Sequence, residues 1–378
     1  MTGRSVQFGV LGPLQITVND GQIVLGTPKQ RAVLAVLLVN RNRPVSVDSL
    51  LTAAWGDDPP AGARAGLHSY ISNLRKLLST AGAGADTLMN APPGYRLTVA
   101  EADLDLGRFA AEKAAGVRAA AAGQFSLASR HLAVALQQWR GPVLEDLVDF
   151  AFVDPLATAL TEDRLVAVTA HAEAEIACGR AATVLPELEA LTAEHPFREP
   201  LWAQLITAYY LGERQHDALA AYGRLKRALA DELGIDPGPT LRALHEQILR
   251  QEPVDAALSA RTAAVGDVTQ LDRRTATAAA GTGAYLEDPA GRRHPLLAVA
   301  TRIGRLDDND IVLPSASVSR HHAAVIDTGT SYVISDLRSA NGIEVGHVPV
   351  RGSTALADGD TIRICDHTFV FRLGDAHG

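Results

Sequence analysis

Three short clusters near the C-terminal end of the chain carry side chains that can bind a phosphate. They are Gly304-Arg305, Ser319-Arg320-His321-His322 and Ser339-Ala340-Asn341-Gly342. Arginine supplies a charged fork, serine a hydroxyl donor and asparagine an amide that both donates and accepts. Together these groups fit a phosphate that is bound beside a peptide backbone. The pattern therefore predicts a phosphopeptide-binding site.

Short extended segments, separated by turn residues, surround these clusters. Their number and spacing are typical of a β-sandwich. Because the loops at one end of a sandwich can converge on one ligand, we expect the three clusters to meet there. The expected strands are Ala284–Glu287, Leu296–Val299, Thr301–Ile303, Asp310–Leu313, Ala323–Asp327, Tyr332–Ser335, Thr361–Cys365 and Thr368–Leu373.

Gly-Arg, Ser-x-x-His and Asn-Gly, in this order and spacing, resemble the motifs of the forkhead-associated (FHA) domain, here over residues 283–374. The resemblance implies that Arg305 and Ser319 bind the phosphate of a phosphothreonine and that Arg320 assists them. It also implies that Asn341 holds the peptide main chain. Ala340 departs from the hydroxyl residue that some members have before the asparagine, which removes one expected hydrogen bond to the peptide.

The same resemblance implies a structural role for Gly304, His322 and Gly342, with His322 tying loops together. The adjacent pair His321-His322 could also be taken for two metal ligands. We prefer the structural interpretation, and we predict neither a metal nor a cofactor.

The N-terminal residues have strand and helix signals of a different kind. Apolar bursts within residues 6–25 are broken by Gly12-Pro13 and by Asn19-Asp20-Gly21, which indicates short strands and a hairpin. Thr27-Pro28 supplies an N-cap and a first-turn proline for a helix that extends to about Arg41. A second short helix is expected over Asp48–Trp55.

A third helix, from about Ala61 to Ser79, is expected to have two distinct faces. Leu67, Ile71, Leu74 and Leu78 form an apolar stripe at helical spacing, which must face the core. The opposite face is polar and cationic, and no acidic residue occurs between Arg64 and Ser79. Such a face suits base edges and phosphates in a major groove, although a solvated helix that happens to lack acids is the alternative. The candidate DNA-binding residues on it are Arg64, His68, Ser69, Ser72, Asn73 and Lys76.

A Pro-Gly turn within residues 91–99 predicts a hairpin, on which Arg96 could reach the DNA backbone or minor groove. Residues 1–100 thus outline an α/β winged helix-turn-helix. The runs TPKQRAVL, SYISNLRKL and PGYRL resemble the DNA-binding domain of actinobacterial antibiotic-regulatory (SARP-type) activators, which is similar to that of OmpR-type response regulators. The resemblance implies that the third helix enters the major groove. It also implies phosphate contacts at the start of the first helix, by Thr27, Lys29 and Gln30.

The middle of the chain, residues 104–251, is expected to be all-α. Helix starts at Gly179 and Gly212 are separated by close to the ~34-residue period of tetratricopeptide (TPR) helix pairs. With the runs WRGP, HPFREPLW and LGIDPGPTL, this segment resembles the bacterial transcriptional activator domain. Trp202, Tyr209, Tyr210 and Tyr222 are interpreted as core residues. Homodimerisation, contact with RNA polymerase and docking between domains remain open as functions of this segment.

Residues 252–282 are rich in alanine, threonine, glycine and aspartate, which predicts a flexible or weakly helical linker. Residues 1–98 contain nine Lys and Arg against five Asp and Glu, whereas the whole chain has a net charge of −8. This asymmetry favours a polyanion as a partner of the first domain only. The two cysteines, the lack of a long apolar run and the lack of a signal peptide favour a cytoplasmic protein.

No P-loop, GxSxG elbow or kinase motif set is present, so we do not expect an enzyme. The order of winged helix, helical activator domain and FHA domain resembles mycobacterial SARP-type regulators. The resemblance implies a regulator that binds double-stranded promoter DNA and whose FHA domain docks on a phosphorylated, PknH-like Ser/Thr protein kinase. The alternative is a phosphothreonine-dependent kinase-binding protein that mainly inhibits or competes, with little specific DNA binding.

Overall fold

The computed structural model describes residues 6–374 except Asp20, Asp57, 281–282, 297–299, 307–308, 329–330 and 351. The chain forms two compact units. The first comprises Met1–Ala111, Gln137–Arg164 and Gln270–Gly378, and the second comprises Glu112–Leu136 and Leu165–Thr269. The N-terminal winged helix and the C-terminal sandwich therefore belong to the first unit, and most of the helical middle belongs to the second.

The winged helix begins with an antiparallel sheet of β1 (Val6–Gly9), β2 (Gln15–Val18) and β3 (Gly21–Gln22). Three helices follow, α1 (Pro28–Val39), α2 (Val47–Trp55) and α3 (Ala63–Ala81). Strand β4 (Val45–Ser46) pairs with β6 (Gly94–Leu97), which pairs with β5 (Leu88–Ala91) to form the wing. The short 3-10 helices η1 (Ala85–Thr87) and η2 (Glu101–Asp103) precede and follow this hairpin. This is the winged-helix architecture that the sequence predicts.

Local sequence signals explain where these helices begin and what they bury. Thr27 caps α1, because its Oγ1 accepts the backbone N–H of Gln30 at 3.4 Å, and Pro28 occupies the first turn. Ser46 caps α2 by accepting the N–H of Ser49 at 3.0 Å. The predicted apolar stripe of α3 is buried, and its members are Leu67, Ile71, Leu74 and Leu78.

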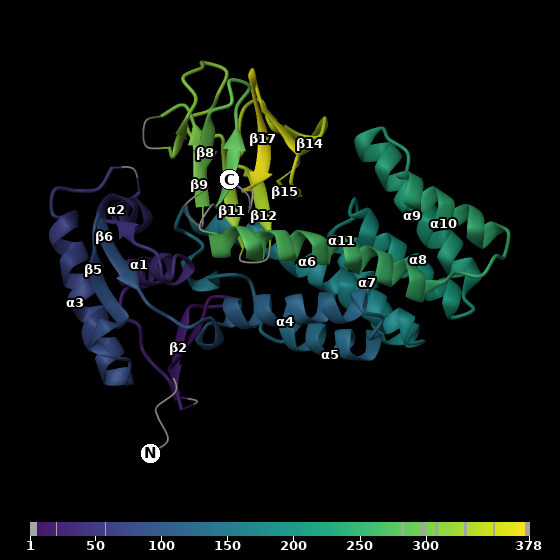
Figure 1. Ribbon diagram of the computed structural model, residues 1–378, viewed down its shortest axis with the longest axis horizontal. Coiled ribbons are helices and arrows are strands. Elements are labelled where there is room, and N and C mark those ends of the chain that lie inside the picture. Colours follow the sequence, from purple (N-terminus) through teal and green to yellow (C-terminus); the bar gives the residue numbers. More distant parts are fainter. Residues whose placement is uncertain are drawn as a thin grey trace. The chain divides into compact units, whose positions relative to one another are not determined.

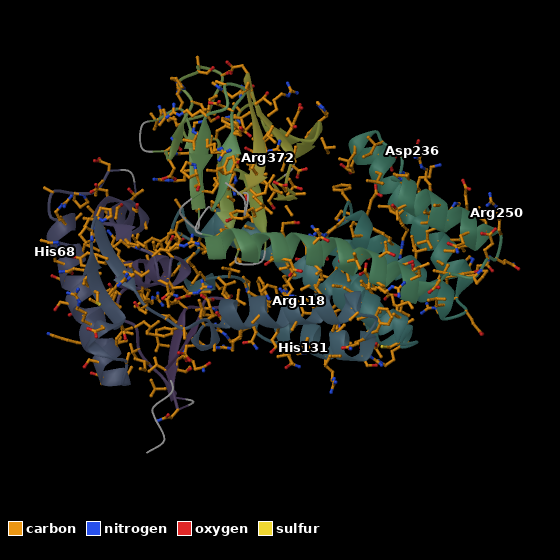
Figure 2. All side chains as sticks on the ribbon, viewed as in Figure 1. His68, Arg118, His131, Asp236, Arg250 and Arg372 are labelled. Carbon is orange, nitrogen blue, oxygen red and sulfur yellow. The ribbon has the colours of Figure 1, made fainter. Side chains whose placement is uncertain are left out.

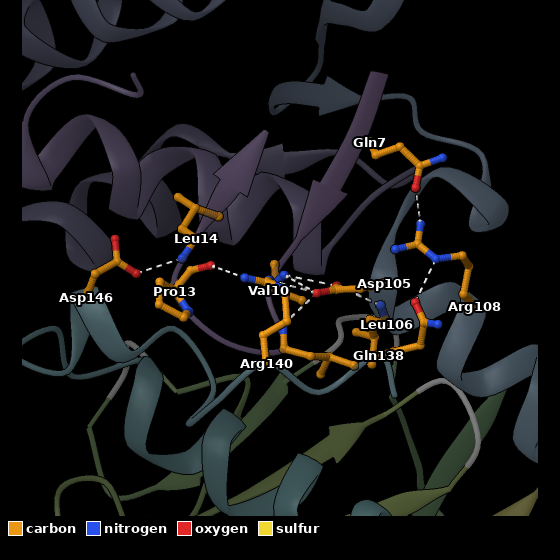
Figure 3. A network of polar contacts seen from close by, with 11 residues as sticks. Gln7, Val10, Pro13, Leu14, Asp105, Leu106, Arg108, Gln138, Arg140 and Asp146 are labelled. Carbon is orange, nitrogen blue, oxygen red and sulfur yellow. Dashed lines mark hydrogen bonds and ion pairs between the residues drawn. The ribbon is translucent and has the colours of Figure 1, made fainter. Parts of the chain in front are cut away.

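A buried carboxylate ties the N-terminal sheet to the start of the helical region (Figure 3). Asp105 is 2% exposed and accepts the backbone N–H groups of Val10 and Leu11, each at 2.9 Å. Arg140 Nη2 donates to the same carboxylate at 3.1 Å. Asp146 accepts the N–H of Leu14 at 2.7 Å. Residues from both sides of the predicted boundary near residue 100 therefore share one hydrogen-bonded network.

The middle of the chain is helical, as predicted. Its elements are α4 (Asp105–Ala121), α5 (Phe125–Leu136), η3 (Glu145–Leu147), α6 (Val153–Ala177), α7 (Ala181–Glu194), α8 (Glu199–Leu211), α9 (Gln215–Leu233) and α10 (Pro239–Leu249). Trp202, Tyr209 and Tyr222 are at most 9% exposed and belong to one core cluster with Leu205 and Leu225, and Tyr210 packs against that cluster. The interpretation of these aromatic residues as core is confirmed.

The segment predicted to be a flexible or weakly helical linker, residues 252–282, is helical over most of its length. Residues Ala256–Ala280 form one long helix, α11, in which Ala260 and Ala264 are buried. The structure thus has the helical one of the two predicted forms, because alanine, which is abundant here, has the highest helix propensity of all residues. Two small side chains at i and i+4 then provide a narrow buried stripe without any large apolar group.

The C-terminal region is a β-sandwich of two sheets (Figure 1). The five-stranded sheet has the order β10 (Ile311–Val312), β9 (Ala300–Gly304), β11 (Ala323–Asp327), β12 (Tyr332–Asp336) and β15 (Ser353–Leu356). The six-stranded sheet has the order β14 (Val348–Val350), β13 (Ile343–Val345), β16 (Thr361–Ile364), β17 (His367–Leu373), β7 (Ala284–Glu287) and β8 (Arg293–Pro295). Ile303, Ile334, Ile362 and Phe371 are fully buried between them. Of the expected strand Leu296–Val299, residues 297–299 lie outside the described residues, and β8, β13, β14 and β15 were not predicted.

Candidate phosphopeptide-binding and DNA-binding sites

The end of β9 and the loop before β11 lie against each other and bring the first two clusters together. Arg305 donates its backbone N–H to the Ser319 carbonyl at 3.0 Å. A Cβ atom on Gly304 would lie 2.3 Å from the carbonyl oxygen of Arg320. Only glycine therefore allows this close approach of the two segments. The side chains of Arg305 and Arg320 are exposed beside Ser319, and within the described residues neither has a recorded ion pair.

The Ser319 hydroxyl is oriented by the third cluster. Its Oγ accepts the backbone N–H of Ala340 at 3.1 Å. Since one lone pair is used in this way, the hydroxyl proton can be directed to an oxygen atom of an approaching phosphate. Asn341 donates its Nδ2 to the Ser317 carbonyl at 2.7 Å, which leaves the geometry of its amide fixed. Its Oδ1 can then accept an N–H group from a peptide main chain.

His322 is fully buried and connects the same two loops. Its Nδ1 accepts the backbone N–H of Ser319 at 3.0 Å, and its Nε2 lies 3.0 Å from the Gly342 carbonyl. A backbone N–H can only donate, so Nε2 must carry the proton and donate to Gly342. Gly342 has a φ of +70°, which favours glycine at this turn. This geometry agrees with the structural role expected for both residues.

Sequence reasoning missed Asn309, which supports the arginine side of the site. Asn309 is 6% exposed, and its Nδ2 donates to the carbonyls of Leu306 and Arg320 at 2.8 and 2.9 Å. Its Oδ1 lies 3.2 Å from His321 Nδ1. The residue lies between aspartates in the run Asp307-Asp308-Asn309-Asp310, and no sequence signal distinguished it. His321 and His322 thus belong to separate networks, and the described part of the chain contains no cluster of three or more His, Cys, Asp or Glu that could hold a metal ion.

The polar face of α3 is exposed as expected. His68, Ser69, Ser72 and Lys76 are exposed, and His68 points outward from the helix in Figure 2. Arg64 is also exposed and forms a solvent-facing ion pair with Asp48 at 3.1 Å. Such a pair is weak and can be exchanged for a phosphate contact.

Gln30 and Lys29 both contact other residues of the winged helix. Gln30 is 7% exposed, and its Nε2 donates to the Leu25 carbonyl at 2.8 Å, while its Oε1 accepts Asn73 Nδ2 at 3.4 Å. Its side chain is therefore a support for α3 rather than a direct DNA contact. Lys29 Nζ lies 5.1 Å from the centre of the Trp55 ring, so this cation packs on α2. Thr27 is exposed at the helix start, where its hydroxyl caps α1.

Arg75 was not among the candidate residues, yet it joins α3 to the wing. Its Nε donates to the Leu88 carbonyl at 3.0 Å and its Nη2 donates to Asn90 Oδ1 at 2.8 Å. Its guanidinium also lies 5.8 Å from the centre of the Tyr95 ring. Arg96, the predicted wing contact, is partly buried on β6. Arg75 therefore fixes the position of the wing relative to the helix.

Comparisons with known proteins give the same three-part organisation. Residues 21–97 match the model of the C-terminal domain of transcriptional regulatory proteins. Residues 104–249 match the bacterial transcriptional activator domain, and residues 301–365 match the FHA domain. The transcriptional regulatory protein EmbR of Mycobacterium tuberculosis is 64% identical over 99% of this chain and 97% of its own length. The chain belongs to the EmbR family of transcriptional regulatory proteins.

A solved structure of M. tuberculosis EmbR in complex with a low-affinity phosphopeptide has a TM-score of 0.96 to this chain. The match covers 99% of this chain and 100% of that one. MoaR1 of M. tuberculosis is 54% identical over 67% of this chain and 82% of its own length. The predicted fold class and family are therefore confirmed. This family consists of transcriptional regulators rather than enzymes. Within the described residues, no helix is long and apolar enough to cross a membrane.

Proposed function

We propose that this regulator couples a Ser/Thr kinase signal to promoter binding. Its FHA domain would read a phosphothreonine on the phosphorylated kinase, and its winged helix would bind double-stranded promoter DNA. The main support is the convergence of Arg305, Ser319 and Asn341 from three loops, with the serine hydroxyl and the asparagine amide already oriented. The phosphopeptide complex of the related EmbR agrees with this proposal.

The acid-free exposed face of α3 favours promoter binding over a function as a kinase competitor alone. Arg64 and Lys76 are available there to phosphates, and Ser69, Ser72 and Asn73 offer hydrogen-bonding groups to base edges. A protein that only competed for the kinase would not need this surface. DNA binding and phosphothreonine binding therefore use different residues of the chain and can be tested separately.

The phosphothreonine site is tested by replacing Arg305. We expect Arg305→Ala to weaken binding of a phosphothreonine peptide by at least about tenfold, because a charge-assisted contact to the phosphate is lost. Titration by fluorescence anisotropy measures this change, with the dephosphorylated peptide as the reference. Arg227→Ala, on the exposed surface of α9, is a matched control that should bind like wild type. Wild-type affinity of the Arg305 variant would refute the assignment.

The coupling is tested by a mobility-shift assay on a promoter fragment, with and without the phosphorylated kinase. We expect a shift by the regulator alone and a change in its midpoint when the kinase is present. Arg305→Ala should keep the first shift and lose the change. If no promoter fragment shifts at moderate salt while the phosphopeptide still binds, the kinase-competitor function replaces the one proposed.

A further inference from the structure

The loop between β10 and β11 is held by two different parts of the sandwich. Its second half, around Ser319, is fixed by His322 and by the backbone of Arg305. Its first half is fixed by the turn between β16 and β17. There Asp366 Oδ1 accepts the hydroxyl of Ser317 at 3.0 Å and that of Ser315 at 3.3 Å. The two hydroxyl oxygens also lie 2.8 Å from each other. One carboxylate thus anchors Ser315 and Ser317, the two serines in the first half of the loop.

The Ser317 carbonyl is the point at which this anchor reaches the candidate peptide site. It accepts Nδ2 of Asn341 at 2.7 Å and the thiol of Cys365 at 3.1 Å. Asn341 is the residue expected to hold the peptide main chain. The position of the Ser317 peptide group therefore determines the orientation of the Asn341 amide. Asp366 holds the side-chain hydroxyl of the same serine.

The same segment also carries the phosphate-binding serine. Val318 lies between Ser317 and Ser319, is 1% exposed, and donates its N–H to the Ser315 carbonyl at 3.1 Å. A buried residue in a tight turn leaves little freedom between its two neighbours. A displacement of Ser317 would therefore also displace Ser319. The Asp366 carboxylate itself is 65% exposed and does not need to touch the peptide to have this effect.

We propose that Asp366 is a positioning residue for phosphothreonine recognition, acting through Ser317 on Asn341 and Ser319. This inference rests on the function proposed above. The hydrogen bond from its own backbone N–H, and next that from the Ser317 hydroxyl, lower the pKa of the Asp366 carboxyl. The carboxylate therefore remains an acceptor for both serines at neutral pH.

The test is a set of titrations with a fluorescent phosphothreonine peptide selected on the wild-type chain from a library fixed only at phosphothreonine. We expect Asp366→Ala to weaken binding by about tenfold, as for a lost hydrogen bond to a charged group. Asp366→Asn should stay within about twofold of wild type, since its amide Oδ1 still accepts the hydroxyls. Ser317→Ala should resemble Asp366→Ala. The double variant should lose no more than either single one, because both act on one contact.

Several controls distinguish a failure of the positioning role from a failure of the proposed function on which it rests. Glu232→Ala, on the exposed surface of α9, should bind like wild type. If Arg305→Ala also binds like wild type, the proposed function itself fails. If Arg305→Ala loses binding while Asp366→Ala does not, only the positioning role is refuted. Equal losses for Asp366→Ala and Asp366→Asn, additive with Ser317→Ala, would show that the charge acts directly on the peptide. If Asp366→Ala does not fold by circular dichroism, Ser317→Ala decides, and its wild-type affinity would refute the inference.

Discussion

At the scale of single residues, the candidate phosphate site depends on groups that never touch the ligand. Gly304 permits the close approach of two backbones, and Asn309 satisfies the carbonyls that this approach buries. The buried ring of His322 likewise satisfies the backbone N–H of Ser319 and the carbonyl of Gly342. Buried polar groups are costly when they lack partners, so these residues form an interdependent set.

Replacing Gly304 tests this dependence. We expect Gly304→Ala to lower the free energy of unfolding by about 1–3 kcal/mol, because its Cβ would be forced against the Arg320 carbonyl. The same displacement should weaken phosphopeptide binding. Thermal and urea denaturation measure the first effect and titration the second. Gly223→Ala in α9, where a Cβ meets nothing within 4 Å, should instead be neutral or stabilising by up to about 1 kcal/mol. Equal behaviour of the two variants would contradict the explanation.

A half-buried carboxyl in the helical region predicts a pH dependence of stability. Burial, and next the charge of Asp267, raise the pKa of Glu173 on α6 to about 8. The folded chain therefore binds a proton here that the unfolded chain releases above its ordinary pKa of 4.5. The stability contributed by this proton is present below that value and is lost as the pH rises toward 8.

Glu173→Gln should remove this dependence, since its amide is neutral at all pH values and can still accept from Gln204, whose Nε2 lies 3.0 Å from Glu173 Oε1. We expect the variant to gain in melting temperature over wild type progressively from about pH 5 to pH 8. Glu232→Gln, which is exposed on α9, should show a difference that does not change with pH. A pH-independent difference for Glu173→Gln would contradict the assignment.

At the scale of elements, the network around Asp105 joins the N-terminal sheet to α4 and to the segment before α6. Asp105→Ala would remove the acceptor of Arg140 Nη2 and of three backbone N–H groups, those of Val10, Leu11 and Leu106, at a position where Asp105 is 2% exposed. Removing one partner of a fully buried ion pair costs about 3–5 kcal/mol. The 29% exposure of the Arg140 side chain reduces this cost here, and the loss of the acceptor for the backbone N–H groups adds to it. We therefore expect a large fall in the urea midpoint of unfolding. Asp149→Ala, an exposed substitution in the same unit, should leave the midpoint unchanged.

At the scale of the whole molecule, the net charge of −8 repels DNA. The first 98 residues have a cationic excess, so attraction to DNA must be local to the winged helix. Promoter affinity should fall steeply between about 50 mM and about 200 mM salt. Lys76→Ala should reduce the slope of log K against log salt by about one, because one phosphate contact is lost. Anisotropy titrations with labelled promoter DNA measure both. An unchanged slope would remove Lys76 from the DNA contacts.

The sequence by itself determined the local features of this protein. The Thr27-Pro28 helix start, the apolar stripe of α3 and the three polar clusters of the FHA domain follow from residue types at short spacing, and short-range geometry decides such features. The short strands β8, β13, β14 and β15 were missed because a segment of three or four residues carries little periodic signal.

Only the tertiary structure decided which polar side chains are available to a ligand and which support others. Gln30 is engaged by Leu25 and Asn73, and Asp366 by serines about 50 positions away. The supporting contact of Asn309 is to the carbonyl of Arg320, which is distant from it along the chain. These partners are brought together by sheet register and loop packing, which the order of residues along the chain does not reveal. Exposure and hydrogen bonding are properties of the folded arrangement, and they separate the residues proposed to bind from those that position them.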